Sequence, residues 1–328
     1  MRIAFFGSDA IAVPALNYLR WAEGVELVGV VSQPDRPAGR GRHLHTNAVS
    51  AWAIAHGIPL LQPEKPGAEE EAWLRGHRVD IALVMAYGHI LRRALLDSVP
   101  RGMWNLHASL LPTYRGASPV ETVLASGEKE TGVTLMGMVE QMDAGSVAGM
   151  ERVPILSTDT GPILRNRLAE ACVPLLQRHL RVLVDGTIKL HAQDEAKASY
   201  TRKLTKADGQ ADFTLSAVEL ERRLRAWQPW PGMSVEHHGQ VLKMGAAMVV
   251  AESAEGVPGT ILRANENGVD VATGMNVLRI QMLQRPGGRM LPVAEFLRGY
   301  HFEIGECLPS RPQRPLVSPK PFPRAAFF

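Results

Sequence analysis

The stretch NLHASLLPTYRG, residues 105–116, carries the side chains with the clearest chemistry in the sequence. It places an amide, Asn105, two residues before an imidazole, His107, just ahead of a Leu-Leu-Pro turn. Residues i and i+2 of an extended strand project from the same face, so both side chains would converge on one point. An amide and an imidazole that converge can bind a carbonyl oxygen as it gains negative charge. We therefore interpret this stretch as a candidate site for chemistry at a carbonyl group.

A third polar side chain, Asp143, follows a predicted strand in the segment EQMDAGSVAG, residues 140–149. A carboxylate beside an imidazole can orient it, hold it charged or accept a proton from an attacking amine. The sequence places no Ser or Cys in a recognisable nucleophile elbow. Asn105, His107 and Asp143 together therefore predict attack of a neutral nucleophile on a carbonyl, with no covalent enzyme intermediate.

These three residues do not form a convincing set of metal ligands, so we expect no metal in catalysis. The two cysteines, Cys172 and Cys307, lie far apart in sequence. Their spacing excludes a disulfide framework and a zinc site of the CxxC type. We interpret the pair His237–His238 as a hairpin turn rather than as a metal site.

The elements that must position these residues alternate along the first half of the chain. Apolar runs predict strands at 2–7, 25–32, 80–88 and 132–139, and amphipathic segments predict helices near 9–22, 46–56, 117–126 and 160–186. Such alternation is typical of an α/β fold with a Rossmann-like, doubly wound and mostly parallel sheet. The first strand-to-helix turn reads GSDAIA and lacks the glycines that let a backbone approach a pyrophosphate, which disfavours an NAD(P) enzyme.

The sequence changes character near residue 190, where a polar and poorly periodic stretch predicts a linker. After it, Ser216 and Glu219 form a capping box before a helix, and short strands separated by turn residues predict a small β-barrel. We therefore expect a catalytic domain at 1–189, a linker at 190–207, a second domain at 208–308 and an irregular tail rich in Pro and Arg at 309–328.

Composition limits the class of protein. The chain has 328 residues, of which 45% are hydrophobic and 21% charged, and its net charge is +3, which is typical of an ordinary globular protein. The N-terminal segment lacks the length of a signal peptide, and no uncharged stretch reaches the length that spans a bilayer. We expect a cytoplasmic protein with no membrane partner.

Three stretches resemble the folate-dependent formyltransferases: AYG at 86–88, NLHASLLPTYRG at 105–116 and MDAG at 142–145. Members of this family transfer a formyl group from 10-formyltetrahydrofolate to an amine. Two further stretches, QPDRPAGRGR at 33–42 and AWQPWPG at 226–232, are similar to the methionyl-tRNA formyltransferase branch of the family. The resemblance runs from the first strand to about residue 308. It implies a C-terminal barrel of the oligonucleotide-binding (OB-like) type that binds tRNA.

The resemblance also implies roles for matching residues. Asn105 and His107 would bind the formyl oxygen, and Asp143 would partner His107 and accept or relay the amine proton. The reaction would be direct attack by the amino group of initiator methionyl-tRNA on the formyl group, through a tetrahedral intermediate, in a monomeric enzyme. Folate contacts are implied at Ser109, Leu110, Leu111, Pro112, Ala86, Tyr87 and Gly88. Contacts to tRNA are implied at Arg36, Arg40 and Arg42.

The chain departs from the family pattern at a few positions. The family commonly has DTGD where this chain has DAGS, so Ala144 and Ser146 replace two polar groups beside Asp143. His89 and Arg92 stand where Leu and Pro are usual, and the loop after residue 42 lacks the usual Pro and Lys. Three alternatives stay open: a formyltransferase acting on a nucleotide-linked amino sugar, a hydrolase of formyltetrahydrofolate, and a non-catalytic RNA-binding protein. The basic GRGR loop favours tRNA over a sugar nucleotide.

Overall fold

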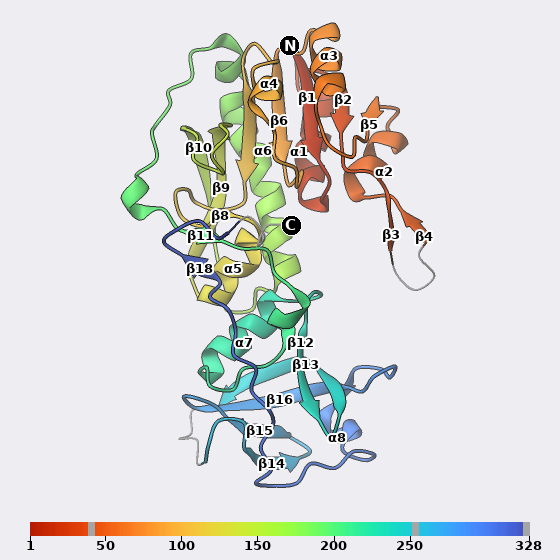
Figure 1. Ribbon diagram of the computed structural model, residues 1–328, viewed down its shortest axis with the longest axis vertical. Coiled ribbons are helices and arrows are strands. Elements are labelled where there is room, and N and C mark those ends of the chain that lie inside the picture. Colours follow the sequence, from red (N-terminus) through yellow and green to blue (C-terminus); the bar gives the residue numbers. More distant parts are fainter. Residues whose placement is uncertain (39–42, 251–255, 324–328) are drawn as a thin grey trace. The chain divides into compact units, whose positions relative to one another are not determined.

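The structure is a computed structural model that describes residues 1–38, 43–250 and 256–323. The chain divides into two compact units (Figure 1). The first comprises Met1–Gly116, Glu130–Pro154 and Arg165–Tyr200. The second comprises Ala117–Lys129, Ile155–Leu164 and Thr201–Phe328. Each unit therefore draws on segments that are far apart in the sequence.

A seven-stranded sheet forms the centre of the first unit, with strand order β10-β9-β7-β6-β1-β2-β5 (Figure 1). Five strands are parallel, and β9 and β10 run antiparallel to their neighbours on one edge. The predicted α/β fold with a mostly parallel sheet is therefore confirmed. The strands are β1 Arg2–Gly7, β2 Glu26–Val31, β5 Leu60–Leu61, β6 Ile81–Met85, β7 Met103–His107, β9 Glu130–Gly137 and β10 Val147–Pro154.

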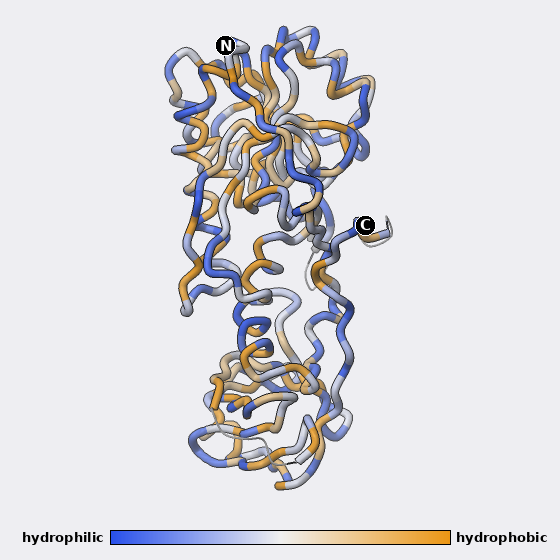
Figure 2. The backbone as a smooth tube through the Cα atoms, turned by 90° about the vertical axis from the view of Figure 1, so that its left-hand side faces the viewer, coloured by the Kyte–Doolittle hydropathy of each residue, from blue (hydrophilic) through white to orange (hydrophobic). Residues whose placement is uncertain are grey.

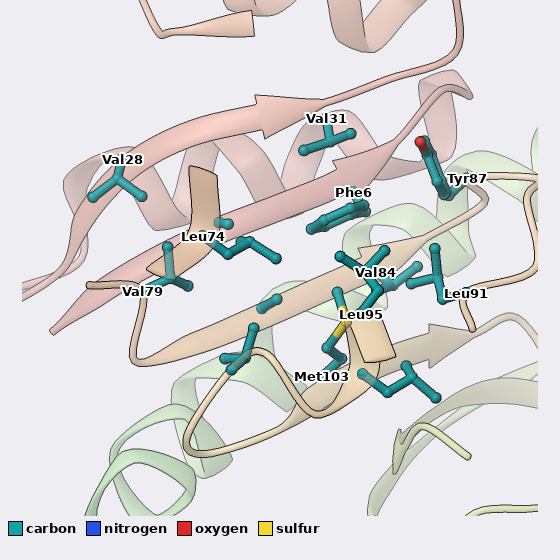
Figure 3. Close-up of a cluster of buried hydrophobic side chains, with 14 residues drawn as sticks. Phe6, Val28, Val31, Leu74, Val79, Val84, Tyr87, Leu91, Leu95 and Met103 are labelled. Atoms are coloured by element: carbon teal, nitrogen blue, oxygen red, sulfur yellow. The ribbon is translucent and has the colours of Figure 1, made fainter. Parts of the chain in front are cut away.

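The central strands are apolar because both faces of the sheet are covered. Every residue of β6 is buried. On one face, Phe6, Val31 and Val84 belong to a hydrophobic cluster that also contains Leu74 and Leu95 (Figure 3). Leu74 belongs to α3, Ala68–Gly76, and Leu95 to α4, Arg93–Leu96, so these two helices cover that face.

The long helix α6, Gly161–Asp185, covers the opposite face of the sheet. Its Cys172 thiol lies 3.6 Å from the Met85 sulfur at the end of β6. The predicted helix near 9–22 is a short 3₁₀ turn, Ala10–Ala12, followed by α1, Val13–Trp21. Asp9 caps the 3₁₀ turn, because its carboxylate accepts a hydrogen bond from the backbone N–H of Ile11. Helix α2, Ala48–Ala55, corresponds to the segment predicted near 46–56.

The second unit contains an antiparallel sheet with strand order β12-β13-β16-β15-β14, and β17 pairs with β16 (Figure 1). The predicted small C-terminal β domain is therefore confirmed. Helix α7 contacts β13, and its predicted capping box is present, since Ser216 Oγ accepts from the Glu219 N–H and the Glu219 carboxylate accepts from the Ser216 N–H. The elements are α5 Pro119–Ser126, α7 Ala217–Ala226, β12 Met233–His237, β13 Gln240–Val250, β14 Ile261–Asn265, β15 Gly268–Ala272, β16 Val277–Gln284, β17 Leu291–Pro292 and α8 Val293–Phe296.

The remaining elements are short. Strands β3 and β4, Arg36–Ala38 and His43–His45, pair with each other in the antiparallel direction. The others are β8 Arg115–Gly116, β11 Tyr200–Thr201, β18 Val317–Ser318 and the 3₁₀ turns Glu195–Lys197 and Lys206–Gly209. Hydrophobic and hydrophilic residues are mixed along most of the backbone (Figure 2). Within the described ranges, no helix is both long enough and apolar enough to cross a membrane.

Candidate active site

Strand β7 ends in the residues that the sequence singled out. It lies between β6 and β9, and its register places Asn105 opposite Met136 and His107 opposite Thr134. The period of two in a strand puts Asn105 and His107 on the same face, and both side chains lie beside the same carboxylate, Asp143. The expected convergence is therefore present.

Asp143 lies in the turn between β9 and β10, with its backbone in the left-handed region at φ +51°. Its Oδ1 accepts a long hydrogen bond of 3.4 Å from the Asn105 amide. Its Oδ2 lies 3.6 Å from His107 Nδ1 and accepts a hydrogen bond of 2.8 Å from the Gly116 N–H. The carboxylate is thus held by backbone on one side and faces the amide and the imidazole on the other.

The other ring nitrogen of His107 has a fixed partner. Nε2 lies 2.9 Å from the backbone carbonyl oxygen of Tyr114, which can only accept a hydrogen bond. Nε2 must therefore carry a proton, and the tautomer follows from this partner. Nδ1 is left as the nitrogen that gains or loses a proton, and it is the one that faces Asp143. The ring is 6% exposed, so its orientation is set by the fold.

The turn that carries Asp143 is held by Gln193, which no sequence pattern singled out, and through it by Arg115 of the NLHASLLPTYRG stretch. Gln193 donates from its amide to the backbone oxygens of Asp143 and Gly145, at 2.8 and 2.7 Å. The Gln193 amide oxygen in turn accepts from the buried guanidinium of Arg115, at 2.8 and 3.1 Å. Arg115 therefore orients Gln193, and Gln193 positions the turn. Gln193 lies in the stretch that we predicted to be a linker.

Arg115 is fully buried, and its charge is compensated. Glu195 accepts hydrogen bonds from both terminal nitrogens of the guanidinium, at 2.7 and 3.0 Å, and the Tyr200 hydroxyl lies 3.0 Å from one of them. The hydrogen bond from Arg115 lowers the pKa of Glu195, so the carboxylate stays ionised. This ion pair and Gln193 support the Asp143 turn through groups other than the side chains of Ala144 and Ser146.

The Ser109–Leu110–Leu111–Pro112 stretch forms a turn directly after β7. The Ser109 hydroxyl is buried and donates to the Thr113 carbonyl at 2.7 Å. Thr134 of β9 donates to the Ser109 carbonyl and accepts from the Leu111 N–H, at 2.7 and 3.1 Å. These bonds fix the turn to the strand beside His107. Leu110 and Pro112 stay partly exposed, and a ligand can reach them.

The Ala86–Tyr87–Gly88 segment leaves the carboxyl end of β6, next to β7. Ala86 and Gly88 are exposed, but the Tyr87 side chain is buried against Phe6 in the hydrophobic cluster (Figure 3). Burial raises the pKa of the Tyr87 hydroxyl, which therefore stays neutral. At this segment the residues open to a ligand are Ala86 and Gly88, while Tyr87 is part of the core.

The strand order places this segment at a particular point of the sheet. The chain runs from β1 outward through β2 to β5 and then returns to place β6 on the other side of β1. The carboxyl ends of β1 and β6 therefore flank the topological switch point, where doubly wound sheets bind ligands. Ser8, after β1, donates its N–H to the Ala86 carbonyl at 3.2 Å, and Gln33 donates to the Tyr87 carbonyl at 2.8 Å.

Only one of the three arginines expected at tRNA lies in a described segment. Arg36 begins β3, is largely exposed and forms an ion pair with Glu64. Arg40 and Arg42 lie outside the described residues.

Comparison with known proteins identifies the family of the chain. Residues 1–180 match the family described as formyl transferase, and residues 203–301 match the C-terminal domain of formyl transferases. A methionyl-tRNA formyltransferase of Thermus thermophilus is 43% identical over 311 residues, covering 94% of this chain and 99% of that protein. The methionyl-tRNA formyltransferase of Janthinobacterium sp. strain Marseille is 40% identical over 313 residues, covering 92% and 98%.

Solved structures share the fold at low sequence identity. The sugar 3N-formyltransferase WlaRD, solved in the presence of dTDP and 5-N-formyl-THF, matches with a TM-score of 0.64 and 16% identity, covering 85% of this chain and 97% of that one. HypX from Aquifex aeolicus, solved in complex with tetrahydrofolic acid, matches with a TM-score of 0.60 and 20% identity, covering 95% and 51%. With relatives at about 40% identity over nearly its whole length, the chain belongs to the formyl transferase family and, within it, to the methionyl-tRNA formyltransferases.

Proposed function

We propose that this chain transfers the formyl group of 10-formyltetrahydrofolate to the amino group of initiator methionyl-tRNA, for translation initiation. The family membership supports the reaction class. The observation that carries the proposal is the meeting of Asn105, His107 and Asp143 at the carboxyl end of β7. An amide donor, an imidazole with one nitrogen available and a carboxylate are the groups that this acyl transfer needs.

The roles follow from the hydrogen bonds around each group. Asn105 Nδ2 and His107 Nδ1 bind the formyl oxygen as it gains negative charge, because each can present a hydrogen at the face where they converge. Asp143 stabilises the protonated form of His107 and accepts the proton that the attacking amine loses. Its bond from the Gly116 N–H leaves the other carboxylate oxygen beside Asn105.

The residues fit a folate beside this group. Bound there, the co-substrate supplies the activated formyl group. The exposed residues Ala86 and Gly88 lie at the switch point of the sheet, and the Ser109–Pro112 turn follows the neighbouring strand. Backbone carbonyl and N–H groups suit the polar edge of a pterin, and Leu110 and Pro112 suit an apolar contact.

We assign tRNA binding to two regions. Arg36, Arg40 and Arg42 contact phosphates near the acceptor end, and the domain at 208–308 contacts backbone farther along the tRNA. The catalytic domain at 1–189 then binds the folate and carries out transfer. The enzyme acts as a monomer in the cytoplasm, where its tRNA substrate is made. No step of this proposal requires a metal ion.

The deciding experiment compares three acceptors in formyl transfer from 10-formyltetrahydrofolate: charged initiator tRNA, an amino-sugar nucleotide and water. Transfer to methionyl-tRNA at least about 100-fold faster than to the sugar is the expected result, because only a cognate acceptor uses binding energy to reach the transition state. A faster sugar reaction would favour the nucleotide-sugar alternative, and release of formate alone would favour the hydrolase. The same assay after exhaustive chelation, with tRNA folding checked separately, tests the metal-free mechanism.

The tRNA assignment has its own test. Each phosphate contact releases counterions, so loss of one contact lowers the salt slope of binding by about 1. Arg42→Ala should weaken tRNA binding and lower the slope while leaving folate affinity unchanged. Lys65→Ala is a control of equal charge change at an exposed residue outside the loop. Equal salt slopes for wild type and Arg42→Ala would remove the support for this loop as a tRNA contact.

A further inference from the structure

A separate cluster of ligand-type side chains lies in the second unit. His237 is the last residue of β12, His238 follows it in the turn to β13, and Glu306 comes 68 residues after His238. His237 Nε2 lies 3.0 Å from one Glu306 oxygen, and His238 Nε2 lies 2.9 Å from the other. One carboxylate therefore faces two imidazoles.

The turn explains how neighbouring histidines reach one point. Successive residues of a strand project to opposite faces, so two adjacent imidazoles would normally diverge. Here His238 and Gly239 both have positive φ, +48° and +71°, and form the two-residue turn between the paired residues His237 and Gln240. The left-handed backbone at His238 brings its ring onto that of His237, with centroids 4.0 Å apart and planes 17° apart. A bulky residue at positive φ is uncommon, and its effect here is to align two Nε2 atoms.

We propose that His237 Nε2, His238 Nε2 and the Glu306 carboxylate form a binding site for a divalent ion of the zinc type, with water completing the coordination. One ligand atom from each residue lies within 4.8 Å of the others. Around a tetrahedral zinc ion with bonds of about 2.0–2.1 Å, ligand atoms are separated by about 3.3 Å. The two nitrogen–oxygen separations are already close to that value, so small side-chain rotations suffice.

The surroundings of His237 support a ligand role. Its Nδ1 lies 2.7 Å from the Tyr300 hydroxyl, which also reaches toward the His237 carbonyl at 3.5 Å. A metal-bound imidazole usually donates its second N–H to an oxygen in this way, which fixes the ring and its tautomer. Phe302 packs 4.7 Å from the same ring, and the His237 side chain is only 1% exposed. The His237 ring is therefore fixed and shielded from solvent, while His238 is 67% exposed and accessible to an incoming ion.

The charges around the cluster are mixed. Arg285 lies over the Tyr300 ring at 5.1 Å, and Glu236, next to His237, pairs with Arg311 at 3.3 Å. Hydrogen bonds from His237 are the main cause that lowers the pKa of Glu306, so its carboxylate is ionised near neutral pH. Without the ion, each imidazole donates its Nε2–H to this carboxylate. An ion at Nε2 requires that nitrogen to be free of hydrogen. A neutral ring then carries its single proton on Nδ1, and a charged ring releases one proton to solvent, so affinity should fall toward acidic pH.

This site would join the tip of the β12–β13 hairpin to the segment that follows α8. The proposed ion is structural and takes no part in the transfer reaction. The sequence could not indicate it, because a His-His pair in a hairpin turn has no third ligand nearby. The fold supplies that ligand as Glu306.

The test titrates metal-free full-length protein with Zn²⁺, by calorimetry with a competing chelator, and with Co²⁺ followed by its visible absorption. One ion per chain is expected for wild type. His238→Ala and Glu306→Gln should bind at least about 10-fold more weakly, and Tyr300→Phe about 10-fold more weakly, as found for groups that orient a ligand. Glu306→Gln keeps the size of the side chain, and His238 is exposed, so both variants should fold.

Two variants serve as matched controls. His301→Ala removes another exposed histidine of the same segment, and Cys307→Ser removes the thiol next to Glu306. Both should bind one ion as wild type does. Absence of one-to-one binding in wild type would overturn the proposal. So would unchanged affinity in His238→Ala and Glu306→Gln, or a loss of affinity in Cys307→Ser equal to theirs.

Discussion

Both units of the molecule bring imidazole and carboxylate groups together, but the distance between nitrogen and oxygen differs between the two sites. In the first unit, His107 Nδ1 and Asp143 Oδ2 are 3.6 Å apart, beyond the range of a good hydrogen bond. In the second unit, Glu306 lies 3.0 and 2.9 Å from two imidazole nitrogens. Both arrangements include a buried histidine, so burial alone does not explain the difference.

The difference lies in what holds each carboxylate. Asp143 is positioned by the Gly116 N–H and by a turn that Gln193 holds at two carbonyl oxygens. Its place does not depend on His107, so a contact between His107 and a reacting group need not displace the carboxylate. Glu306 is instead positioned by the imidazoles themselves, and both of its oxygens are occupied. The His107–Asp143 pair, with its wider separation and its carboxylate held by a fixed turn, suits proton transfer. The closer contacts of Glu306 with His237 and His238 suit a structural bond or an ion.

Removing the charge of Asp143 should have the largest effect. Asp143→Asn keeps a side-chain acceptor for the Gly116 N–H but cannot accept the amine proton or stabilise a charged His107. We expect turnover to fall by at least about 100-fold, the range seen when a general base is lost. Single-turnover formyl transfer measures the effect, and folate binding should persist.

Asp97→Asn is the matched control for this substitution. Asp97 is a half-exposed carboxylate of the same unit that pairs with Arg93. Its substitution removes the same charge without touching the proposed site. Turnover of Asp143→Asn within a few-fold of the Asp97→Asn value would rule out the proposed role of the Asp143 carboxylate.

The turn that carries Asp143 can be disrupted at Gly145. A Cβ placed there would lie 1.7 Å from the backbone oxygen of Gly137, so the turn must move if any side chain is added. Gly145→Ala should lower the free energy of unfolding by about 3 kcal/mol, the upper end for overpacking, and reduce turnover because Asp143 is displaced. Urea unfolding and the transfer assay measure the two effects. Gly76→Ala, at a helical glycine with open space around it, should be neutral or slightly stabilising.

The contact of Arg115 with Gln193, which holds the Asp143 turn from behind, should contribute less to stability and turnover. Arg115→Met removes the guanidinium that orients Gln193 and leaves a partly buried amide oxygen without its donor. We expect a loss of about 2 kcal/mol in the free energy of unfolding, as for a hydrogen bond to a charged group. The smaller fall in turnover should appear in kcat rather than in the KM for tRNA. Arg93→Met, in an exposed ion pair, should change neither quantity.

The sequence predicted the parts of this comparison that depend on local periodicity. Alternation in a strand indicated that Asn105 and His107 share a face, and the structure confirms it. The capping box at Ser216 and Glu219 and the hairpin turn at His237–His238 are likewise present, because each depends on residues within a few positions of one another.

The parts that could not be predicted depend on contacts between distant segments. Gln193 reaches the Asp143 carbonyl across 50 positions, and Arg115 reaches Glu195 across 80. Strand β10, Val147–Pro154, was also missed, since its Gly, Met and Arg residues show no clear alternation and only its place beside β9 makes it a strand. No local pattern specifies such partners.

The smallest expected effect concerns the contacts of Glu306 with His237 and His238 in metal-free protein. Hydrogen bonds from His237 lower the pKa of Glu306, so its contribution to stability is complete above the ordinary glutamate value of about 4.3. The contribution is lost as the pH falls through the lowered pKa, because the unfolded chain then takes up protons more readily. Glu306→Gln should remove this pH dependence and lower the free energy of unfolding by less than about 1 kcal/mol near neutral pH, since the carboxylate is partly exposed.

Hydrogen exchange of peptides covering 230–245, measured between about pH 3.5 and 6 with intrinsic exchange rates corrected, reports the effect locally. Glu303→Gln makes the same charge change at an exposed position of the same segment and should leave the profile of wild type unchanged. If both variants show the same pH profile, Glu306 is not held by the imidazoles, and the contrast with Asp143 fails.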